Sequence, residues 1–152
     1  MTLHQNVLGV DVAKDWIDVC DPGGGVRRLQ NVPRTLKAFA KAAGDALVVF
    51  EASGGYDRAL VIALEAAGVA YARVNPRHAR EFARATGRLA KTDRVDARVL
   101  AQMGAALKLN PTKPTEPERR RLSAPRHQQR HPGDNPPLAP DRSRDRRPFA
   151  RI

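Results

Sequence analysis

The 152-residue chain has few of the residues that mark several common classes of protein. Its one cysteine, Cys20, excludes an intrachain disulfide and a zinc site built from clustered cysteines. We expect Cys20 to be a small buried strand residue. No run approaches the roughly 18 apolar residues of a transmembrane helix. The N-terminus also lacks the charged and apolar regions of a signal peptide. These absences predict a cytoplasmic protein without a membrane anchor.

Aromatic residues are scarce as well, at 5% of the chain, whereas hydrophobic residues reach 41%. The core must therefore be built mainly from Val, Leu, Ile and Ala. The length is sufficient for one domain with its own core and argues against two complete ones.

Basic residues are abundant. The formal net charge is +11, and the isoelectric point is near 11.0. Lys and Arg gain free energy by neutralising phosphates and releasing counterions, so this charge predicts a nucleic-acid partner. An anionic membrane surface is the alternative polyanion.

The chain changes character near residue 110. Residues 111–152 hold 9 of the 12 prolines and almost no periodic hydrophobicity. We therefore predict a folded domain over 1–110 and a disordered tail over 125–152. Out-of-frame translation of a GC-rich gene would produce such a tail, and the downstream nucleotide sequence would test that hypothesis.

Hydrophobic periodicity predicts five strands and four helices in the folded part. Short apolar or alternating runs bounded by turn residues predict strands over 7–12, 16–20, 26–31, 46–50 and 69–74. Helical spacing with start and stop signals predicts helices over 33–43, 56–67, 76–86 and 95–107. This order favours an α/β fold, with an antiparallel meander followed by parallel strands in one mixed sheet flanked by helices.

Four acidic residues occupy positions suited to a metal-dependent nuclease. Asp11 ends the first predicted strand and Glu51 follows the fourth. Asp93 and Asp96 are three residues apart at the start of the last predicted helix, a spacing that places both on one helical face. Carboxylates are hard ligands that suit Mg²⁺ or Mn²⁺. The four residues are therefore candidate metal ligands and catalytic residues.

Glu51 is the strongest single candidate, because a carboxylate directly after an apolar run is costly to bury unless it is paired or metal-bound. For seven other acids solvation is a sufficient explanation, since they lie at strand alternations, turns or helix faces: Asp15, Asp18, Asp21, Asp45, Asp57, Glu65 and Glu81.

Three sequence blocks carry a family resemblance: GVDVAKD at 9–15, FEASGGY at 50–56, and NPRHAREFARATGRLAKTDRVDARVLA at 75–101. Together they resemble the N-terminal domain of the DEDD transposases of bacterial insertion sequences, the family of bridge-RNA-guided recombinases. The resemblance covers about residues 6–122, and KTDRVDA is its most specific part. It implies a ribonuclease H-like (RuvC-type) fold, with Asp11, Glu51, Asp93 and Asp96 at the four DEDD positions.

The resemblance also implies partners and missing parts. Family members act on DNA with a structured guide RNA, and the full-length proteins are expected to form homo-oligomers. Their C-terminal domain contributes a serine nucleophile and is joined by a helical segment, whose start the resemblance implies over 111–124. Neither that domain nor the complete linking helix is found in this sequence. We therefore expect a truncated chain whose capacity for strand transfer on its own is in doubt.

Arginines recur every three or four residues between 73 and 88, and further cations lie beside the acids. Because eight cations between 73 and 98 meet only three acids there, we interpret them as a path for a phosphate backbone, with a solvated helix face as the alternative. The candidate nucleic-acid contacts are Lys14, Tyr56, Arg77, Arg80, Arg84, Arg88, Lys91, Arg94 and Arg98. Residues 53–56 are more typical of a tight turn than of a phosphate loop.

Two other functions remain open at this stage. One is a catalytically silent, nucleic-acid-binding or dimerising remnant of a transposase, which would retain the same four acids. The other is half of an actin-like sugar or acetate kinase. Against the kinase, the chain lacks a second phosphate-binding glycine motif and a second domain of the same fold.

Overall fold

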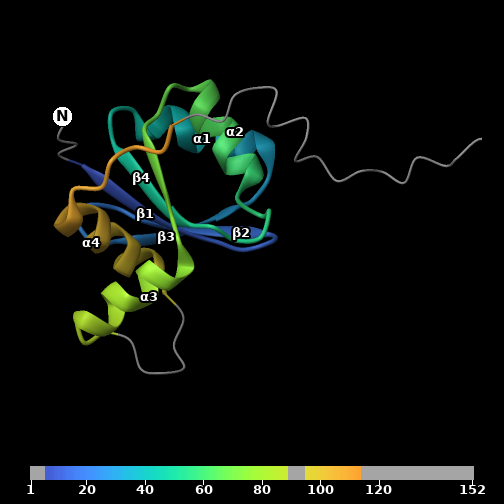
Figure 1. Cartoon of the computed structure of the whole chain (residues 1–152). Helices are drawn as coiled ribbons and strands as arrows, with labels where there is room; N and C mark the ends of the chain where they lie inside the picture. The colour runs from blue at the N-terminus through green and yellow to red at the C-terminus, as the bar shows by residue number, and fades with distance from the viewer. Residues whose placement is uncertain (1–5, 89–94, 114–152) are drawn as a thin grey trace, which may run out of the picture. The chain divides into compact units, whose positions relative to one another are not determined.

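The computed structural model describes residues 6–88 and 95–113 (Figure 1). The elements within these ranges are β1 (Val7–Val12), β2 (Trp16–Cys20), β3 (Val26–Gln30), α1 (Pro33–Ala43), β4 (Leu47–Glu51), α2 (Arg58–Ala66), β5 (Tyr71–Val74), α3 (Pro76–Ala85) and α4 (Ala97–Leu107). The predicted order of strands and helices is confirmed. The predicted tail over 125–152 and most of the predicted linker lie outside the described residues.

The five strands form one mixed sheet in the order β3-β2-β1-β4-β5. β1 pairs antiparallel with β2, and β2 pairs antiparallel with β3. β1 pairs parallel with β4, and β4 pairs parallel with β5. The α/β class and the mixed five-stranded sheet are therefore as predicted, in the arrangement expected of a ribonuclease H-like domain.

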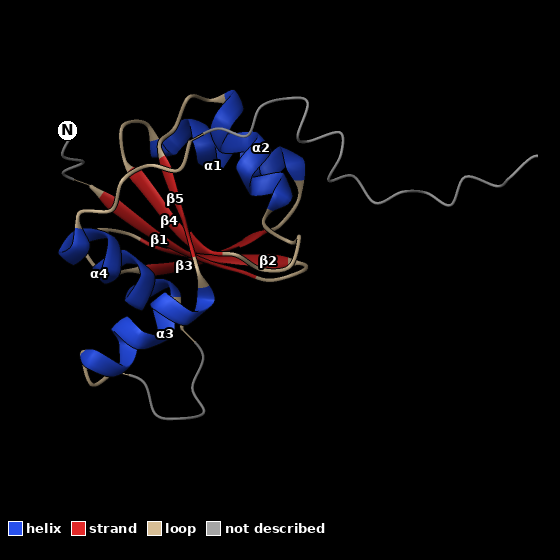
Figure 2. Ribbon diagram, in the orientation of Figure 1, coloured by secondary structure: helices blue, strands red, loops and turns tan. Residues whose placement is uncertain are grey.

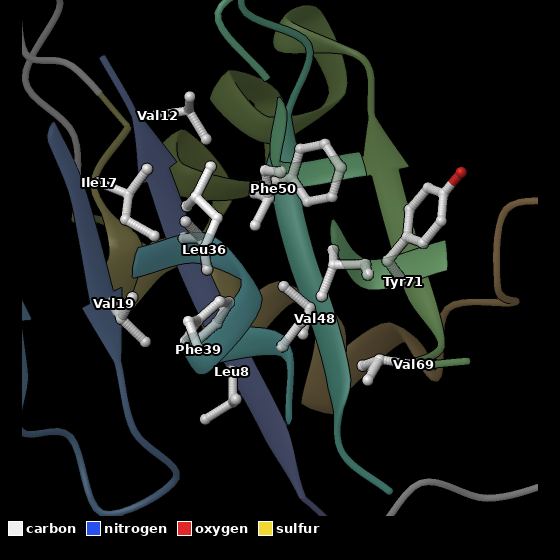
Figure 3. Close-up of a cluster of buried hydrophobic side chains, with 14 of the residues drawn as sticks. Leu8, Val12, Ile17, Val19, Leu36, Phe39, Val48, Phe50, Val69 and Tyr71 are labelled. Carbon is white, nitrogen blue, oxygen red and sulfur yellow. The ribbon is translucent and has the colours of Figure 1, made fainter. Parts of the chain in front are cut away.

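Helices cover both faces of the sheet (Figure 2). Side chains of α1 and α2 pack on one face, where Val10, Phe50 and Leu36 are fully buried (Figure 3). Side chains of α3 and α4 pack on the other face with Val49 and Ala72. The interior strand β4 is therefore buried on both sides, which explains its continuous apolar run. None of the helices in the described part of the chain is long and apolar enough to span a bilayer.

α4 lies close against β1 because each of the two elements has a glycine in the contact, Gly9 on β1 and Gly104 on α4. A Cβ built on Gly9 would overlap the backbone oxygen of Ala97. A Cβ on Gly104 would lie 2.7 Å from methyl groups of Val7 and Val49. The first turn of α4 therefore rests directly on the backbone of β1, which sets where this helix stops covering the sheet.

Two predicted helix starts are wrong by two residues. α2 begins at Arg58, not residue 56, because Gly54 and Gly55 have φ angles of 66° and 114° that keep this segment in turns. α4 begins at Ala97, not residue 95, because Asp96 is its N-cap. The predicted strand over 69–74 is also shorter and begins at Tyr71.

Two acids assigned to solvent have partners inside the fold. Asp57 is only 1% exposed. Glu65 is half-buried and accepts a hydrogen bond of 2.8 Å from the Tyr71 hydroxyl. The solvation interpretation is wrong for both, because α2 turns these side chains toward β5, a contact that local sequence does not reveal.

Candidate active site

Asp11 and Glu51 are neighbours on the sheet. The parallel register of β1 and β4 pairs Val10 with Phe50, so the next residues, Asp11 and Glu51, lie side by side. Both are half-buried, and alternation along the strands places them on the face that α3 and α4 cover. The first two predicted site residues are therefore brought together at the carboxyl ends of adjacent central strands.

A pocket of about 320 Å³ opens beside these two carboxylates. Its lining comes from the end of β1 with the turn that follows, and from the end of β4 with the loop that follows: Asp11, Val12, Ala13, Lys14, Glu51, Ser53 and Tyr56. Lys14 and Tyr56 are exposed at its edge. The pocket is small and polar, and it has the acids on its wall.

The position of α4 explains why this part of the sheet is open. The helix begins above Gly9, and Asp11 lies two residues, roughly 6.6 Å, further along β1. Cys20, paired with Gly9, is buried beneath the helix, and burial raises the pKa of its thiol. The expectation of a buried strand cysteine is thus confirmed, and the uncovered area begins at the Asp11 row.

The spacing of Asp93 and Asp96 predicts that both lie on one face of the last helix. Asp96 instead lies just before α4, as its N-cap. Its backbone is extended, and its Oδ1 accepts a hydrogen bond of 3.0 Å from the backbone N–H of Val99. Asp is favoured at this position because its oxygen satisfies an N–H that has no partner within the helix. The helical-face argument for Asp93 and Asp96 is therefore wrong, and Asp93 itself lies outside the described residues.

The complete four-carboxylate cluster is accordingly not seen. Within residues 6–88 and 95–113, no three His, Cys, Asp or Glu side chains form a group that could hold a metal ion. Of the four predicted acids, the structure describes three. Asp11 and Glu51 are neighbours on the sheet, and Asp96 lies at the start of α4.

Asp18 is an acidic neighbour that sequence reasoning had assigned to solvent. It pairs with Asp11 across the antiparallel β1–β2 ladder. Arg28 of β3 binds both of its oxygens, with bonds of 2.8 and 2.9 Å. The hydrogen bond from Arg28 is the main reason why the pKa of Asp18 lies below its usual value. The alternation of buried and exposed residues along the two strands could have indicated that Asp11 and Asp18 lie on the same side of the sheet. It could not have shown that they are directly opposite each other.

Asp57 anchors the loop between β4 and α2. Its buried carboxylate accepts a hydrogen bond of 2.6 Å from Nε of Arg73 on β5. The hydroxyl of Ser53, which lines the pocket, donates to the same carboxylate at 3.3 Å. The ion pair therefore ties the pocket wall to β5 at the edge of the sheet, a role that no local pattern around Asp57 indicates.

Asn31 holds the two loops of the pocket together. Its Nδ2 donates to the backbone oxygen of Ala13 at 2.8 Å and to that of Tyr56 at 3.0 Å. The first oxygen belongs to the loop after β1 and the second to the loop after β4. A side-chain amide can make these two bonds at once because it carries two N–H donors. Sequence reasoning missed this residue.

The predicted arginines of α3 lie on its outer side. Arg77, Arg80 and Arg84 are exposed, whereas Ala79 and Ala83 are fully buried against the core. Arg88, just after the helix, is also exposed, as is Arg98 on the first turn of α4. Lys91 and Arg94 lie outside the described residues.

Two of the eight cations between 73 and 98 have acidic partners, and one of these partners, Asp57, lies outside the three acids counted from the sequence. Arg73 pairs with Asp57, and Arg77 pairs with Glu81 at 3.0 Å, one helical turn away. The second pair is exposed and contributes little attraction in water. The excess positive charge on this side therefore rests mainly on the other arginines.

A larger pocket, of about 580 Å³, lies between α1 and α2 on the opposite side of the sheet. Alanines and aliphatic residues dominate its lining, with Lys37 and Lys41 as the charged members and no carboxylate. Its size does not make it the reactive site, because it lacks groups for acid–base chemistry or metal binding.

Comparison with known families agrees with this geometry. The family model for DEDD transposases of the IS110 type, described as a transposase, matches residues 8–131. The match includes the sheet except Val7, the first residue of β1, together with both site loops and all four acids of the predicted DEDD set. Comparison with curated proteins found no match. The chain belongs to the DEDD transposase family of the IS110 type.

Proposed function

We propose that this chain is the nucleic-acid-binding and metal-binding domain of a DNA transposase. Membership of the transposase family supports a role in DNA transposition. The single observation that supports the finer proposal is the placement of Asp11 beside Glu51 on the uncovered part of the sheet. In this proposal Asp93 and Asp96 complete the catalytic carboxylate set.

The donor chemistry of the pocket is suitable for Mg²⁺ or Mn²⁺. Two carboxylates on neighbouring strands offer oxygen ligands, which hard divalent cations prefer. The capping bond of Asp96 uses one oxygen of that carboxylate, and the group has a second. When bound, a pair of ions would activate an attacking oxygen and stabilise a leaving one in phosphodiester chemistry.

The chain's own residues would bind and orient the DNA. Lys14 lines the pocket and is exposed, so its ammonium can neutralise a phosphate that approaches the carboxylates. The exposed arginines of α3 would hold the backbone further away, because cations gain free energy when phosphates release counterions. Asn31 and Asp57 keep the loops around the pocket in place.

Metal titration tests the site. Calorimetry with Mn²⁺ should detect binding to the full chain and a loss of that binding in Asp11→Asn and Glu51→Gln. Asp45→Asn is the matched control, since this exposed acid precedes β4 whereas Glu51 ends it. Retention of Mn²⁺ binding in both site variants would contradict the proposal. Absence of any metal binding by the wild type would favour the silent remnant.

Salt-dependent binding tests the basic surface. The affinity for a DNA duplex should fall with added salt, and Arg80→Ala or Arg84→Ala should each reduce the slope by about one phosphate contact. Arg34→Ala on α1 is the control, because it removes an exposed cation from the opposite side of the sheet. If the acid variants lose DNA as completely as the arginine variants, this division of roles is wrong.

Three partner proposals rest on family membership alone: a structured guide RNA, a second copy of the chain, and a C-terminal domain with a serine nucleophile. The actin-like kinase is not supported, because the matching family is one of transposases.

A further inference from the structure

Trp16, the only tryptophan of the chain, is 45% exposed at the start of β2. Strand alternation places it on the same face as Asp18 and Cys20. Exposure increases along this face because α4 covers Cys20, Asp18 is partly buried, and Trp16 lies beyond both. The indole therefore belongs to the uncovered area that carries the acidic residues.

Only two aromatic side chains are exposed among the described residues. Phe39, Phe50 and Tyr71 are buried, and Phe82 is partly buried. The exposed ones are Trp16 and Tyr56, which is 52% exposed and lines the Asp11 pocket. Because aromatic residues are scarce in this chain, these two exposed rings near the acidic residues favour a ligand with flat apolar faces.

One backbone hydrogen bond and two from a side-chain amide link the backbone segments that carry the two aromatic residues. The N–H of Ala13 donates to the carbonyl of Trp16 at 2.9 Å. The carbonyl of Ala13 in turn accepts from Asn31, which also donates to the carbonyl of Tyr56. The backbones of Trp16 and Tyr56 are thus linked through Ala13 and Asn31, and Ala13 and Tyr56 line the Asp11 pocket.

The neighbouring charges indicate which part of a nucleic acid would contact the indole. A phosphate is repelled by carboxylates, whereas the uncharged face of a base is not. In a duplex each base face already stacks on its neighbours, so an exposed indole gains a stacking contact only with an unpaired base. Stacking on aromatic side chains is a general means of holding single strands.

A protein partner is a weaker explanation for this exposed indole. Its cross-strand neighbour is Gln30, and the next row holds the Asp18–Arg28 ion pair. The centres of protein interfaces are depleted of charged residues. Trp16 is therefore surrounded by groups that suit a polar, wet contact with nucleic acid.

We propose that Trp16 stacks on an unpaired base of the DNA strand that enters the Asp11 and Glu51 pocket, which Tyr56 lines. The proposal rests on the proposed DNA-binding function and extends it, since it requires that the DNA at the site be single-stranded or locally opened. It adds a binding residue that lies outside the motifs carrying the acids.

Intrinsic fluorescence tests the proposal directly, because tryptophan emission reports Trp16 alone. The full chain is titrated with a labelled single-stranded DNA of mixed sequence, in EDTA, so that the result does not depend on metal. Anisotropy of the label measures binding, while tryptophan emission measures stacking. We expect emission to be quenched in parallel with binding, and a fully paired duplex to quench it far less.

Variants separate stacking from simple apolar contact. Trp16→Ala and Trp16→Leu should each weaken single-strand binding by about 5- to 100-fold. Trp16→Phe should retain most of the affinity because its ring remains flat. Ile62→Ala is the control, since it removes an exposed apolar side chain from α2 on the opposite face.

Each contrary outcome has a distinct meaning. Binding without quenching, or equal quenching by duplex and single strand, would overturn the stacking proposal and leave DNA binding intact. Stronger quenching by RNA of the same sequence would assign the indole to an RNA strand instead. An emission change that follows protein concentration without nucleic acid would assign it to self-association. No change in anisotropy with any nucleic acid would overturn the proposed function and this proposal together.

Discussion

Asp18 faces Asp11 directly across two antiparallel strands, and Arg28 on the third strand binds both oxygens of Asp18. Like charges directly opposite each other destabilise a sheet. The guanidinium of Arg28 offsets the negative charge of Asp18. Asp11 and Asp18 can therefore face each other without disrupting the pairing of β1 and β2. The Asp18–Arg28 ion pair is thus the charged neighbour of Asp11 on the β2 side.

Arg28→Gln should raise the pKa of Asp18, because the hydrogen bond from Arg28 is the main cause of its lowered value. A lowered folded-state pKa stabilises the protein above the unfolded value, about 3.9, and this contribution is lost as the pH falls through the folded pKa. The variant should therefore be less stable than wild type at neutral pH, and the difference should shrink below about pH 4.

Carbon-13 NMR titration of the Asp18 carboxyl and urea unfolding at several pH values measure the two effects. Arg27→Gln is the control, since its 3.8 Å contact with Asp21 is looser and exposed. An unchanged Asp18 pKa in Arg28→Gln would contradict this assignment.

Gly9→Ala should displace α4 from the sheet, because the new methyl group would overlap the backbone of Ala97. The loss in the free energy of unfolding should be at least about 2–3 kcal/mol. Gly23→Ala is the control, because a Cβ at that position meets nothing within 4 Å.

The thiol of Cys20 provides an independent readout of the same change. Burial under α4 should make it react slowly with a thiol reagent in the wild type. Displacement of the helix in Gly9→Ala should accelerate the reaction well beyond that of Gly23→Ala. Equal labelling rates in the two variants would show that α4 remains in place.

Arg73→Met should destabilise the domain by about 2–4 kcal/mol, because it leaves the buried carboxylate of Asp57 without its cation. Arg77→Met, which removes an exposed pair with Glu81, should change stability by no more than about 0.5 kcal/mol. Urea denaturation of both variants measures the contrast. Similar small losses would mean that Asp57 is adequately solvated after all.

Asn31→Ala should loosen both pocket loops, because it removes the donor shared by Ala13 and Tyr56. The stability loss should be about 1–2 kcal/mol. Amide hydrogen exchange should accelerate at residues 13–15 and 52–57, and Mn²⁺ binding should weaken. Gln30→Ala, at the exposed preceding position, is the control. Unaltered exchange in both loops would rule out this bridging role.

Local patterns were sufficient for the element order. The strand over Val7–Val12 and the helix over Pro33–Ala43 were predicted with their observed bounds, because apolar spacing and punctuation by proline and glycine act within a few residues. The start of α4 was not predicted correctly, since an acid can occupy either the first turn of a helix or its N-cap. Only the observed bond from Val99 to Asp96 distinguishes the two.

The sequence by itself determined the α/β class, and it indicated that Asp11 and Glu51 end two strands, because an acid after an apolar run is a local signal. Tertiary structure alone decided that these residues are neighbours and that Asp18 faces Asp11, since strand register depends on residues far apart in the chain. It likewise decided that Asp57 is buried with Arg73, and that the uncovered face begins where α4 meets Gly9. Burial and opening are properties of packed layers, so no single segment encodes them.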